Sequence, residues 1–432
     1  MHGSGGFGDM PWESARLRRV AVSSGSVHKE GTAWGLTFDA PRRCGYVLAR
    51  GAHPSVRRRL DPRRHWLPTS PSGPAFHNRL DVIEAAPEHQ HDVHGPWKHQ
   101  GVVTHYTLYN AGRSLAHTEF GVEGMTNRRA LDALIPAEQQ DPPDRTSGVY
   151  RHLGDWWNNA DLVRGSFGGR LDGVEQLRRA SQWLQATGLA YAVEADRRRA
   201  PRCSMVLPWQ LNESFPNAWC TSAVDFLGEP KPAFWAVARA FARNRITLRT
   251  DAVAWDGRSA SAEAWLWSEG RLPGGRVVLR ARTLDGSVLA ERTWTIEAAA
   301  AEPTAVASLT LQPEGLFLWD GEWHAGGELV DREVVLATGD ADLAGLLDLP
   351  YAEVRVEADA DGVTVQHVAG PAVIGLVLAD ARDAGASGFV ALSGDPRPLL
   401  PGECRRLPVV ARNGEPWRVR VEAWNLDAVT VG

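Results

Sequence analysis

Two glutamates follow short apolar runs, in positions where a carboxylate can do chemistry. Glu119 ends the run at residues 114–119 and precedes Phe120-Gly121, where a glycine permits a tight turn. A carboxylate at such a strand end is suited to act as a nucleophile or a general base. A structural ion pair between Glu119 and an arginine such as Arg113 would use the same residue, so position alone leaves both interpretations open.

Glu213 stands at a second strand end with different neighbours. It follows the run at residues 205–210, with Trp209 and Asn212 close by. An indole packs against the apolar face of a sugar ring, while an amide and a carboxylate bind hydroxyl groups. This combination suits a polyhydroxylated ligand, although a capped strand end packed in the core would use the same residues. The chain holds 18 tryptophans, and whether most of them bind sugar or fill the core stays open.

The histidines are grouped in a way that invites a metal site. His89, His91 and His94 stand close together with Asp92 between them. In one extended segment alternate side chains point to opposite faces, so these residues do not offer three ligands on one side. We therefore expect no metal, and histidines that form hydrogen bonds near a polar pocket. The chain also lacks the motifs of serine hydrolases, P-loop proteins and dinucleotide-binding proteins.

The elements that must position these residues differ along the chain. Up to about residue 243, expected strands at 65–70, 91–94, 114–119 and 205–210 alternate with helical segments. Strands alternating with helices favour a parallel sheet, either open or closed into a barrel. Polar residues at the carboxyl ends of parallel strands are where such folds place their chemistry.

Two helices are expected within this first part. The apolar period predicts one helix at residues 172–199, which begins with a capping box formed by Asp172 and Glu175. A second helix is expected at residues 232–242. Residues 1–60 match this alternating pattern poorly.

From residue 246 onward the hydrophobic pattern has a period of two. Clear alternation occurs at residues 261–267 and 417–424, and Asp-Gly pairs at 256, 285 and 361 are typical of hairpin turns. We therefore expect two antiparallel sandwiches, at residues 244–345 and 346–432, after a first domain at residues 1–243.

Composition restricts the class of protein. The 432 residues have a net charge of −5, which argues against nucleic acid as the main partner. No apolar run is long enough for a membrane span, and no secretory signal is visible. The four cysteines lie far apart, which is typical of a reduced, cytoplasmic protein.

Several of these segments resemble the β-mannosidases of glycoside hydrolase family two. Trp-Gln-Leu-Asn at residues 209–212 is similar to the last barrel strand of that family, and Thr-Glu-Phe-Gly at 118–121 is similar to its nucleophile motif. Further similar segments occur in the same order along the chain, at residues 61–64, 70–73, 92–97, 230–236, 399–403 and 423–425.

This resemblance implies a multidomain fold of α/β and all-β parts. Residues 1–243 would be the carboxyl-terminal part of a (β/α)8 TIM barrel, with residues 1–60 matching poorly. Two immunoglobulin-like β-sandwiches would follow. Family members carry further domains and the first half of the barrel before the matching region. We therefore expect this chain alone to be poorly stable or inactive, because half a barrel leaves two sheet edges exposed.

The implied activity is that of a hydrolase, a retaining exo-β-glycosidase that removes terminal β-mannose through a covalent glycosyl-enzyme. Glu119 would be the nucleophile, and a second carboxyl group about 5–5.5 Å away would be the acid/base. Glu30 is the candidate for that role, although Lys29 stands where the family has asparagine. The implied substrate contacts are Trp209, Asn212, Glu213, His94 and Trp97.

The implied chemistry needs only two carboxyl groups, so no cofactor is expected. The expected partner is an oligosaccharide or β-mannoside substrate, with no nucleic acid and no membrane, and the oligomeric state stays open. Related β-glycosidases acting on glucosamine, galactose or glucuronic acid remain alternatives. A non-catalytic carbohydrate-binding or remnant protein is the alternative from another class.

Overall fold

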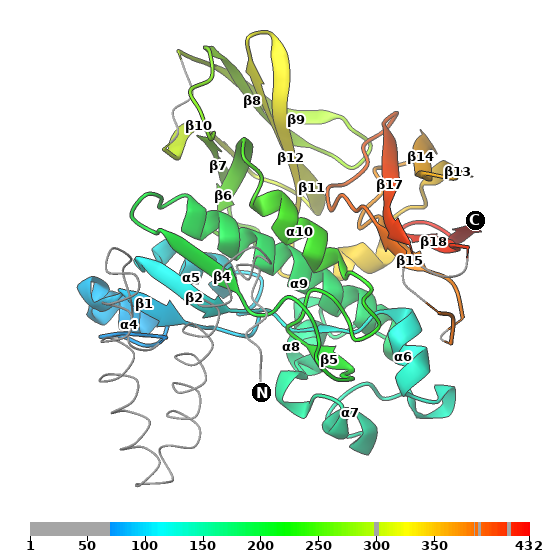
Figure 1. Cartoon of the computed structure of the whole chain (residues 1–432). Helices are drawn as coiled ribbons and strands as arrows, with labels where there is room; N and C mark the ends of the chain where they lie inside the picture. Colours follow the sequence, from blue (N-terminus) through cyan, green and yellow to red (C-terminus); the bar gives the residue numbers. More distant parts are fainter. Residues whose placement is uncertain (1–69, 298–301, 384, 388–389, 413–415) are drawn as a thin grey trace, which may run out of the picture. The chain divides into compact units, whose positions relative to one another are not determined.

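The computed structural model describes residues 70–297, 302–383, 385–387, 390–412 and 416–432, and its helices and strands are labelled in Figure 1. The chain forms two compact units. The described part of the first unit comprises residues 70–97, 111–121 and 202–211, and the second comprises residues 98–110, 122–201 and those described from 212 onward. Glu119 therefore belongs to the first unit, and Glu213 belongs to the second.

A three-stranded parallel sheet forms the centre of the first unit. Its strands are β1 (Asp92–His94), β2 (Ala116–Phe120) and β4 (Met205–Pro208), in the order β1-β2-β4. The helix α4 (Leu80–Ala85) and the short η2 (Pro87–His89) precede β1. The three corresponding strand predictions and their parallel pairing are confirmed. The predicted strand at residues 65–70 lies outside the described residues, apart from Ser70.

Helices make up most of the first half of the second unit. The longest is α9 (Gly173–Arg197), which packs against α10 (Pro232–Ala240). A two-stranded antiparallel ribbon joins β3 (Gly124–Met125) to β5 (Trp219–Cys220). The other helices are α5 (Thr104–Ala111), α6 (Arg128–Leu134), α7 (Gly148–His152) and α8 (Ala160–Ser166), with short 3-10 turns η3 (Ala137–Gln139) and η4 (Asp155–Trp157).

The amino-terminal end of α9 differs from its sequence prediction. The helix itself is confirmed, but the predicted capping box is wrong, because the Asp172 side chain makes no capping hydrogen bond. Instead, Gln176 Oε1 accepts the N–H of Asp172 at 2.8 Å. Glu175 pairs with Arg178 and Arg179, at 2.6 and 2.9 Å. Arg178 and Arg179, one turn along the helix, therefore bind the Glu175 carboxylate that the predicted capping box would have used.

Two glutamines on α9 hold the loops of the second unit. Gln182 Nε2 donates to the carbonyl of Met125 at 3.1 Å, and Gln185 Nε2 donates to the carbonyls of Val122 and Ser222 at 2.9 and 3.0 Å. Because these groups are buried, each bond satisfies a backbone carbonyl that would otherwise be costly to bury. The segments that follow Glu119 and Trp209 in the sequence are thus fixed to one helix.

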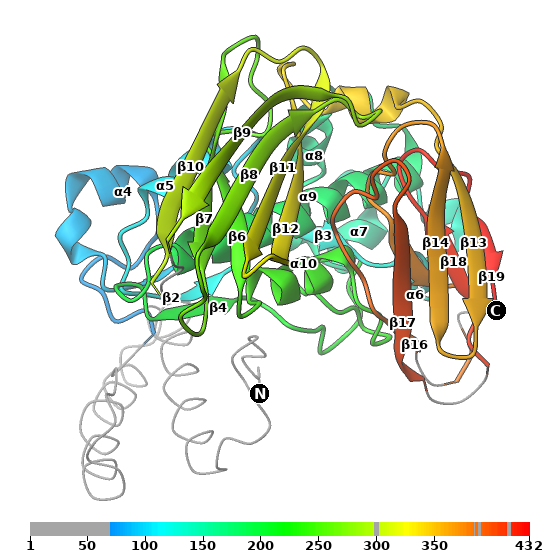
Figure 2. The same cartoon turned by 90° about the horizontal axis from the view of Figure 1, so that it is seen from above.

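Two antiparallel sheets follow α10, and their strands are labelled in Figure 2. They have the orders β10-β7-β6 and β12-β11-β8-β9 and contact each other through β6, β11 and β12. Trp319 and Trp323 on β11 are buried, so these two indoles fill the core. The strands are β6 (Arg245–Thr250), β7 (Ala260–Trp267), β8 (Gly275–Arg282), β9 (Val288–Ile296), β10 (Thr304–Leu311), β11 (Leu316–Ala325) and β12 (Glu328–Thr338).

The predicted Asp-Gly turns lie between strands. Asp256 and Gly257, between β6 and β7, have φ angles of 50° and 68°, and Gly286, between β8 and β9, has a φ of 90°. Left-handed backbone at these positions explains the Asp-Gly pairs, because glycine and aspartate tolerate it better than other residues.

The carboxyl-terminal part contains two more antiparallel sheets after a short helical turn, η5 (Ala344–Asp348). Their orders are β13-β14-β17-β16 and β15-β18-β19. Val363, Val365, Val419 and Val421 belong to the apolar core that these strands enclose. The strands are β13 (Glu353–Asp359), β14 (Gly362–Ala369), β15 (Val377–Asp380), β16 (Val390–Leu392), β17 (Cys404–Arg412), β18 (Val419–Glu422) and β19 (Val429–Val431).

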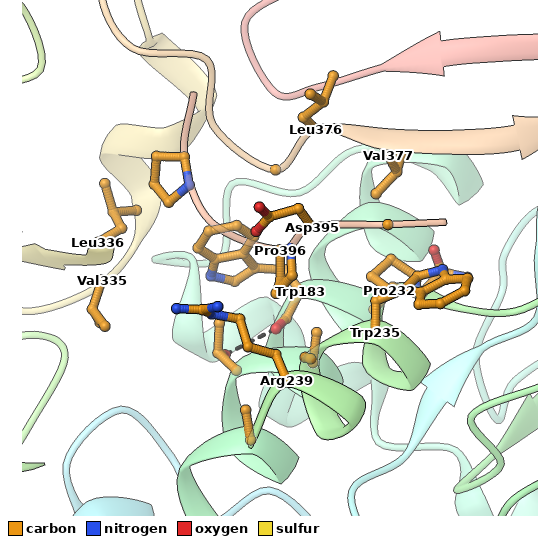
Figure 3. A pocket seen from close by; sticks show the side chains of 18 of the residues that line it. Trp183, Pro232, Trp235, Arg239, Val335, Leu336, Leu376, Val377, Asp395 and Pro396 are labelled. Atoms are coloured by element: carbon orange, nitrogen blue, oxygen red, sulfur yellow. Dashed lines mark hydrogen bonds between the residues drawn. The ribbon is translucent and has the colours of Figure 1, made fainter. Parts of the chain in front are cut away.

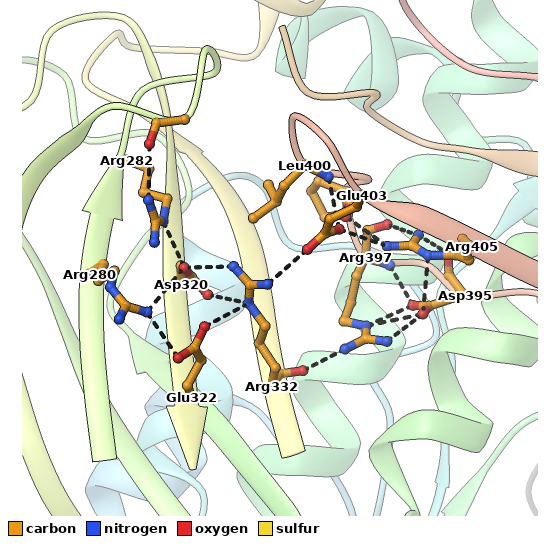
Figure 4. A network of polar contacts seen from close by, with 12 residues as sticks. Arg280, Arg282, Asp320, Glu322, Arg332, Asp395, Arg397, Leu400, Glu403 and Arg405 are labelled. Carbon is orange, nitrogen blue, oxygen red and sulfur yellow. Dashed lines mark hydrogen bonds and ion pairs between the residues drawn. The ribbon is translucent and has the colours of Figure 1, made fainter. Parts of the chain in front are cut away.

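A polar network links the sheet containing β11 and β12 to the carboxyl-terminal part (Figure 4). Asp320 accepts hydrogen bonds from Arg282 at 2.8 Å and from Arg332 at 2.7 and 2.9 Å. Arg332 also donates to Glu403 at 2.8 Å, and its carbonyl accepts from Arg397 at 3.0 Å. One arginine thus bridges the two parts through charged and backbone groups.

The three cysteines among the described residues, Cys203, Cys220 and Cys404, form no disulfide. Within the same residues, no helix is both long enough and apolar enough to cross a membrane.

Candidate active site

Glu119 lies on the middle strand of the parallel sheet, near its carboxyl end. His94 is its register partner on β1, and on the other side the N–H of Trp209, which follows β4, donates to the carbonyl of Phe120 at 2.6 Å. Parallel strands bring their carboxyl ends to one edge, so the three predicted site residues Glu119, His94 and Trp209 gather at that edge. The peptide bond between Trp209 and Gln210 is cis.

His94 is the side chain beside the Glu119 carboxylate. Its Nδ1 lies 3.5 Å from Glu119 Oε2, and the two side chains are only 7% and 13% exposed. His94 Nε2 lies 2.8 Å from Ser70 Oγ and 3.1 Å from Thr118 Oγ1. Both ring nitrogens are thus engaged within the first unit, and the predicted sugar contact His94 faces the predicted nucleophile.

The contacts of His94 continue to a buried acid. Ser70 Oγ lies 2.8 Å from Thr118 Oγ1, and the Thr118 hydroxyl is hydrogen-bonded to Asp92. Asp92 also accepts the N–H of Ser72 at 2.8 Å. These contacts form a chain, Asp92–Thr118–Ser70–His94–Glu119, which we call the Asp92 chain.

The contacts of the Asp92 chain allow two arrangements of the protons. If His94 carries both ring protons, each contact from Glu119 to an ionised Asp92 has one donor: Nδ1–H, Nε2–H, the Ser70 hydroxyl and the Thr118 hydroxyl. If the hydroxyls turn round, the same contacts are satisfied by a protonated Asp92 and a neutral His94. In both arrangements Nδ1–H points at Glu119. In both arrangements Asp92 and His94 share one proton through the two hydroxyl groups.

The electrostatic environment of Asp92 is compatible with either arrangement. Burial raises the pKa of the Asp92 carboxyl, and hydrogen bonds from Thr118 and Ser72 partly offset that rise. A buried carboxyl group with a raised pKa can accept the shared proton at low cost.

Two tryptophans stand at the same edge of the sheet. Trp209 and Trp97 are both half-buried, and the Trp97 ring meets His94 edge-on, with ring centroids 6.2 Å apart. Gly95 has a φ of 74°, and a Cβ there would lie 3.1 Å from the Trp97 ring, so a glycine lets this indole lie close to the backbone. Partly exposed indoles beside a carboxylate form a surface suited to a sugar ring.

The two remaining predicted ligands lie in the second unit. Asn212 is exposed, and its Nδ2 donates to the carbonyl of Glu213 at 3.3 Å. The Glu213 side chain has no exposed surface and pairs with the equally buried Lys231 at 3.6 Å. Glu213 also accepts the Ser222 hydroxyl at 2.8 Å and the N–H of Phe226 at 3.2 Å. The prediction that Glu213 binds sugar hydroxyls is therefore not met by this geometry, because internal donors surround its carboxylate.

Glu30, the predicted acid/base, and its neighbour Lys29 lie outside the described residues. Among the histidines considered for a metal, His89 and His91 are exposed, whereas His94 is buried in the Asp92 chain.

Sequence reasoning missed a second buried carboxyl group, Glu123. Its Oε2 accepts the N–H of His99 at 3.1 Å, and its Oε1 has no hydrogen-bond partner within the described residues. His99 stacks on His105 with ring centroids 4.3 Å apart, and a Cβ on Gly188 would lie only 2.8 Å from the His99 ring. Burial raises the pKa of Glu123 to about 8. The apolar context Val122-Glu123-Gly124 was the only signal in the sequence.

Replacing Glu123 with glutamine is expected to change how stability depends on pH. The pKa rises from 4.5 to about 8 on folding, so the unfolded chain releases this proton first and wild-type stability falls between those pH values. Glutamine does not titrate and keeps an acceptor for His99. The free energy of unfolding of Glu123→Gln relative to wild type should therefore rise by up to about 1.4 kcal/mol per pH unit in that window. Urea titrations at several pH values would measure this.

Glu138→Gln, at an exposed glutamate, is the matched control and should show no such trend. A constant difference between Glu123→Gln and wild type across the window would contradict a protonated Glu123.

The chain is similar in sequence to known β-mannosidases. No protein-family model matches the chain. Beta-mannosidase B of Aspergillus niger is 26% identical over 260 residues, covering 55% of this chain and 29% of the relative. Beta-mannosidase B of Neosartorya fischeri is 28% identical over 224 residues, covering 49% and 24%. The chain thus spans less than a third of the length of the curated relatives it matches.

Solved structures show a similar fold. The β-D-mannosidase from Dictyoglomus thermophilum has a TM-score of 0.66 and 16% identity, covering 89% of this chain and 45% of that one. The Amycolatopsis orientalis exo-chitosanase CsxA has a TM-score of 0.61 and 17% identity, covering 78% and 45%. The mixed helix and strand architecture is shared with these multidomain enzymes.

The sequence relatives and the structural neighbours both include β-mannosidases. The resemblance is therefore confirmed: this chain is similar to the carboxyl-terminal portion of the β-mannosidases of glycoside hydrolase family two.

Proposed function

We propose that this chain carries the nucleophile of a retaining exo-β-glycosidase that hydrolyses terminal β-mannose residues. The observation that supports this most strongly is the position of Glu119 at the carboxyl end of the parallel sheet, with His94 Nδ1 3.5 Å from its carboxylate and Trp209 on the neighbouring strand end. We propose mannose rather than another sugar because the relatives of this chain include β-mannosidases.

In the proposed reaction, a Glu119 oxygen attacks the anomeric carbon and forms an ester bond as the glycosidic C–O bond breaks. The acid/base gives a proton to the departing oxygen. It then removes a proton from water, which attacks the same carbon and releases the sugar with its original configuration. Glu30 is the proposed acid/base.

The Asp92 chain holds the nucleophile in place. His94 Nδ1 lies 3.5 Å from Glu119 Oε2, and this contact would orient the carboxylate for attack. We propose Trp209 as the platform under the sugar, Trp97 as a second apolar wall and Asn212 as a hydroxyl ligand. Glu213 serves to position its loop.

We propose the same division of the chain as the resemblance implies. Residues 1–243 would be the carboxyl-terminal part of a (β/α)8 barrel, and residues 244–345 and 346–432 would be two immunoglobulin-like sandwiches. The parallel strands β1, β2 and β4, and the four antiparallel sheets after α10, support this division.

Release of nitrophenol from 4-nitrophenyl β-mannoside tests the proposed function. The purified chain and its Glu119→Gln variant would be compared on this substrate and on the β-glucosaminide, β-galactoside and β-glucuronide. We expect hydrolysis of the mannoside above the other three, and its loss in the variant. Faster hydrolysis of another sugar would reassign the substrate, and equal hydrolysis by the variant would contradict the role of Glu119.

A non-catalytic carbohydrate-binding protein is the second candidate. Lys29 in place of the family's asparagine favours it, because the acid/base motif is then incomplete. In that case neither protein would release nitrophenol, Glu119→Gln would leave sugar binding unchanged, and Trp209→Ala would weaken it.

Thr118→Val is expected to reduce turnover without removing the nucleophile. Valine keeps the shape of the side chain but breaks the Asp92 chain between Asp92 and Ser70. Losing one hydrogen bond of this kind should lower kcat roughly tenfold. The pKa of Asp92 should rise further without the Thr118 hydroxyl, so the pH–rate profile should change shape as well. Initial rates across pH would measure both effects.

Thr107→Val, at an exposed threonine on α5, is the matched control and should leave kcat and the pH profile unchanged. If Thr118→Val has the pH profile of the wild type, the Asp92 chain has a packing role only, which would contradict its proposed role in holding the nucleophile.

A further inference from the structure

The second unit contains a cavity that shares no lining residue with the proposed Glu119 site (Figure 3). Its accessible volume is about 170 Å³, somewhat larger than the roughly 150 Å³ cavity that holds a benzene ring. Trp183 on α9 and Trp235 on α10 contribute two of its walls. Val335 on β12, Val377 on β15 and Pro396 between β16 and β17 contribute others. A space of this size accommodates one six-membered ring.

Most of the charged side chains around the cavity are paired with one another, and the exception is Glu229, whose Oε1 accepts the N–H of Asp380 at 2.8 Å while its Oε2 has no hydrogen-bond partner within the described residues. Arg239 binds Asp331 and Glu333 at 3.0 and 3.1 Å, and Asp395 binds Arg397 at 2.5 Å. Arg178 binds Glu422 at 3.0 Å, and Arg245 binds Glu333 at 2.7 Å. A charged ligand would have to break one of these buried pairs, which is costly. The cavity is therefore suited to a neutral ligand.

The two indoles offer both an apolar face and a hydrogen-bond donor. Neither indole N–H of Trp183 or Trp235 has a hydrogen-bond partner within the described part of the chain. A ligand that displaces water from these groups must supply acceptors, because a lost hydrogen bond reduces affinity. A hydrocarbon ring fills the space but supplies none, whereas a pyranose has an apolar C–H face and hydroxyl oxygens around it.

Two glycines keep the indoles close to the loops that line the cavity. A Cβ on Gly394 would lie 2.3 Å from the Trp235 ring, and one on Gly375 would lie 2.7 Å from the Trp424 ring and 3.4 Å from Trp183. The absence of side chains here lets the backbone pack directly on the rings. The walls are thus already in place without a ligand, which lowers the entropic cost of binding.

From these observations we propose that this cavity is an accessory binding site for a single neutral pyranose unit. The apolar face of the sugar lies on an indole, and its hydroxyl oxygens accept the N–H groups of Trp183 and Trp235. This inference does not depend on catalysis, because an inactive chain can bind sugar here and an active chain can lack the site.

Titration with methyl β-D-mannopyranoside, followed by ligand-observed NMR, tests the proposal. The Glu119→Gln/Trp209→Ala double variant serves as background, because it weakens sugar binding at the proposed active site. We expect a saturable dissociation constant of about millimolar size. Trp235→Ala in this background should raise it at least about tenfold, and Ala190→Trp should abolish binding by filling the cavity. Trp156→Ala, at a 74% exposed tryptophan away from the cavity, should leave it unchanged.

Three results would overturn the proposal. The first is no binding by a background protein that still unfolds cooperatively. The second is binding that both Trp235→Ala and Ala190→Trp leave unchanged. The third is binding of toluene in place of the pyranoside, which would identify an apolar cavity.

Discussion

Glu119→Ala is expected to lower kcat/KM for 4-nitrophenyl β-mannoside by at least about a thousandfold. Alanine removes the oxygen that would form the glycosyl ester, beside His94 at the end of the strand. The loss should appear in kcat, because Trp209 and Trp97 still bind the sugar. Steady-state kinetics beside circular dichroism would measure the effect and verify folding.

Added azide separates a lost nucleophile from a disturbed site. In Glu119→Ala the anion can enter the space left by the carboxylate and attack the anomeric carbon from the same side. We expect azide to restore turnover and to give the α-glycosyl azide as product. Glu138→Ala, at an exposed glutamate, should retain wild-type activity with no response to azide. Turnover by Glu119→Ala within about tenfold of wild type would refute its proposed role.

Lys231→Met is expected to have the largest effect on stability, a loss of about 3–5 kcal/mol in the free energy of unfolding. Lys231 Nζ lies 3.6 Å from Glu213 and donates to the carbonyls of Gly124 and Cys220 at 3.3 and 3.4 Å. Methionine fills the space but leaves a buried carboxylate without its counter-charge. Burial already raises the pKa of Glu213, and the charge of Lys231 offsets part of that rise. Urea denaturation would measure the loss.

Two further variants distinguish the ion pair from simple packing. Lys98→Met, at an exposed lysine, should change the free energy of unfolding by less than about 0.5 kcal/mol. The double variant Lys231→Met/Glu213→Gln should recover part of the loss, because it removes the unpaired charge. Equal stability of Lys231→Met and wild type would show that the buried pair is not a structural element.

Much of the frame of the site could be predicted from the sequence. The short apolar runs at β1, β2 and β4 end in polar residues, and the rule for parallel strands then brings Glu119, His94 and Trp209 to one edge. The apolar period also predicted α9 to within two residues at each end. These predictions succeeded because strand and helix periods are local properties.

The contacts within the site could not be predicted in the same way. Ser70 and Thr118 are 48 residues apart and meet only because of how the chain returns to the sheet. Glu213 looked like a sugar ligand because the sequence shows a carboxylate beside an indole, but not that Lys231 is buried against it. Side-chain partners distant in sequence depend on tertiary packing, which one sequence does not reveal.

The most direct test of the proposed nucleophile is to trap the glycosyl-enzyme. A 2-deoxy-2-fluoro-β-mannosyl fluoride reacts without help from an acid, because fluoride leaves unprotonated, so the outcome is independent of Glu30. The 2-fluorine slows the second step, because it destabilises the positively charged transition state, and the ester then accumulates. Peptide mass spectrometry of the inactivated chain should find the fluorosugar on Glu119. A label on a different residue, or unchanged hydrolysis with no label, would contradict the account.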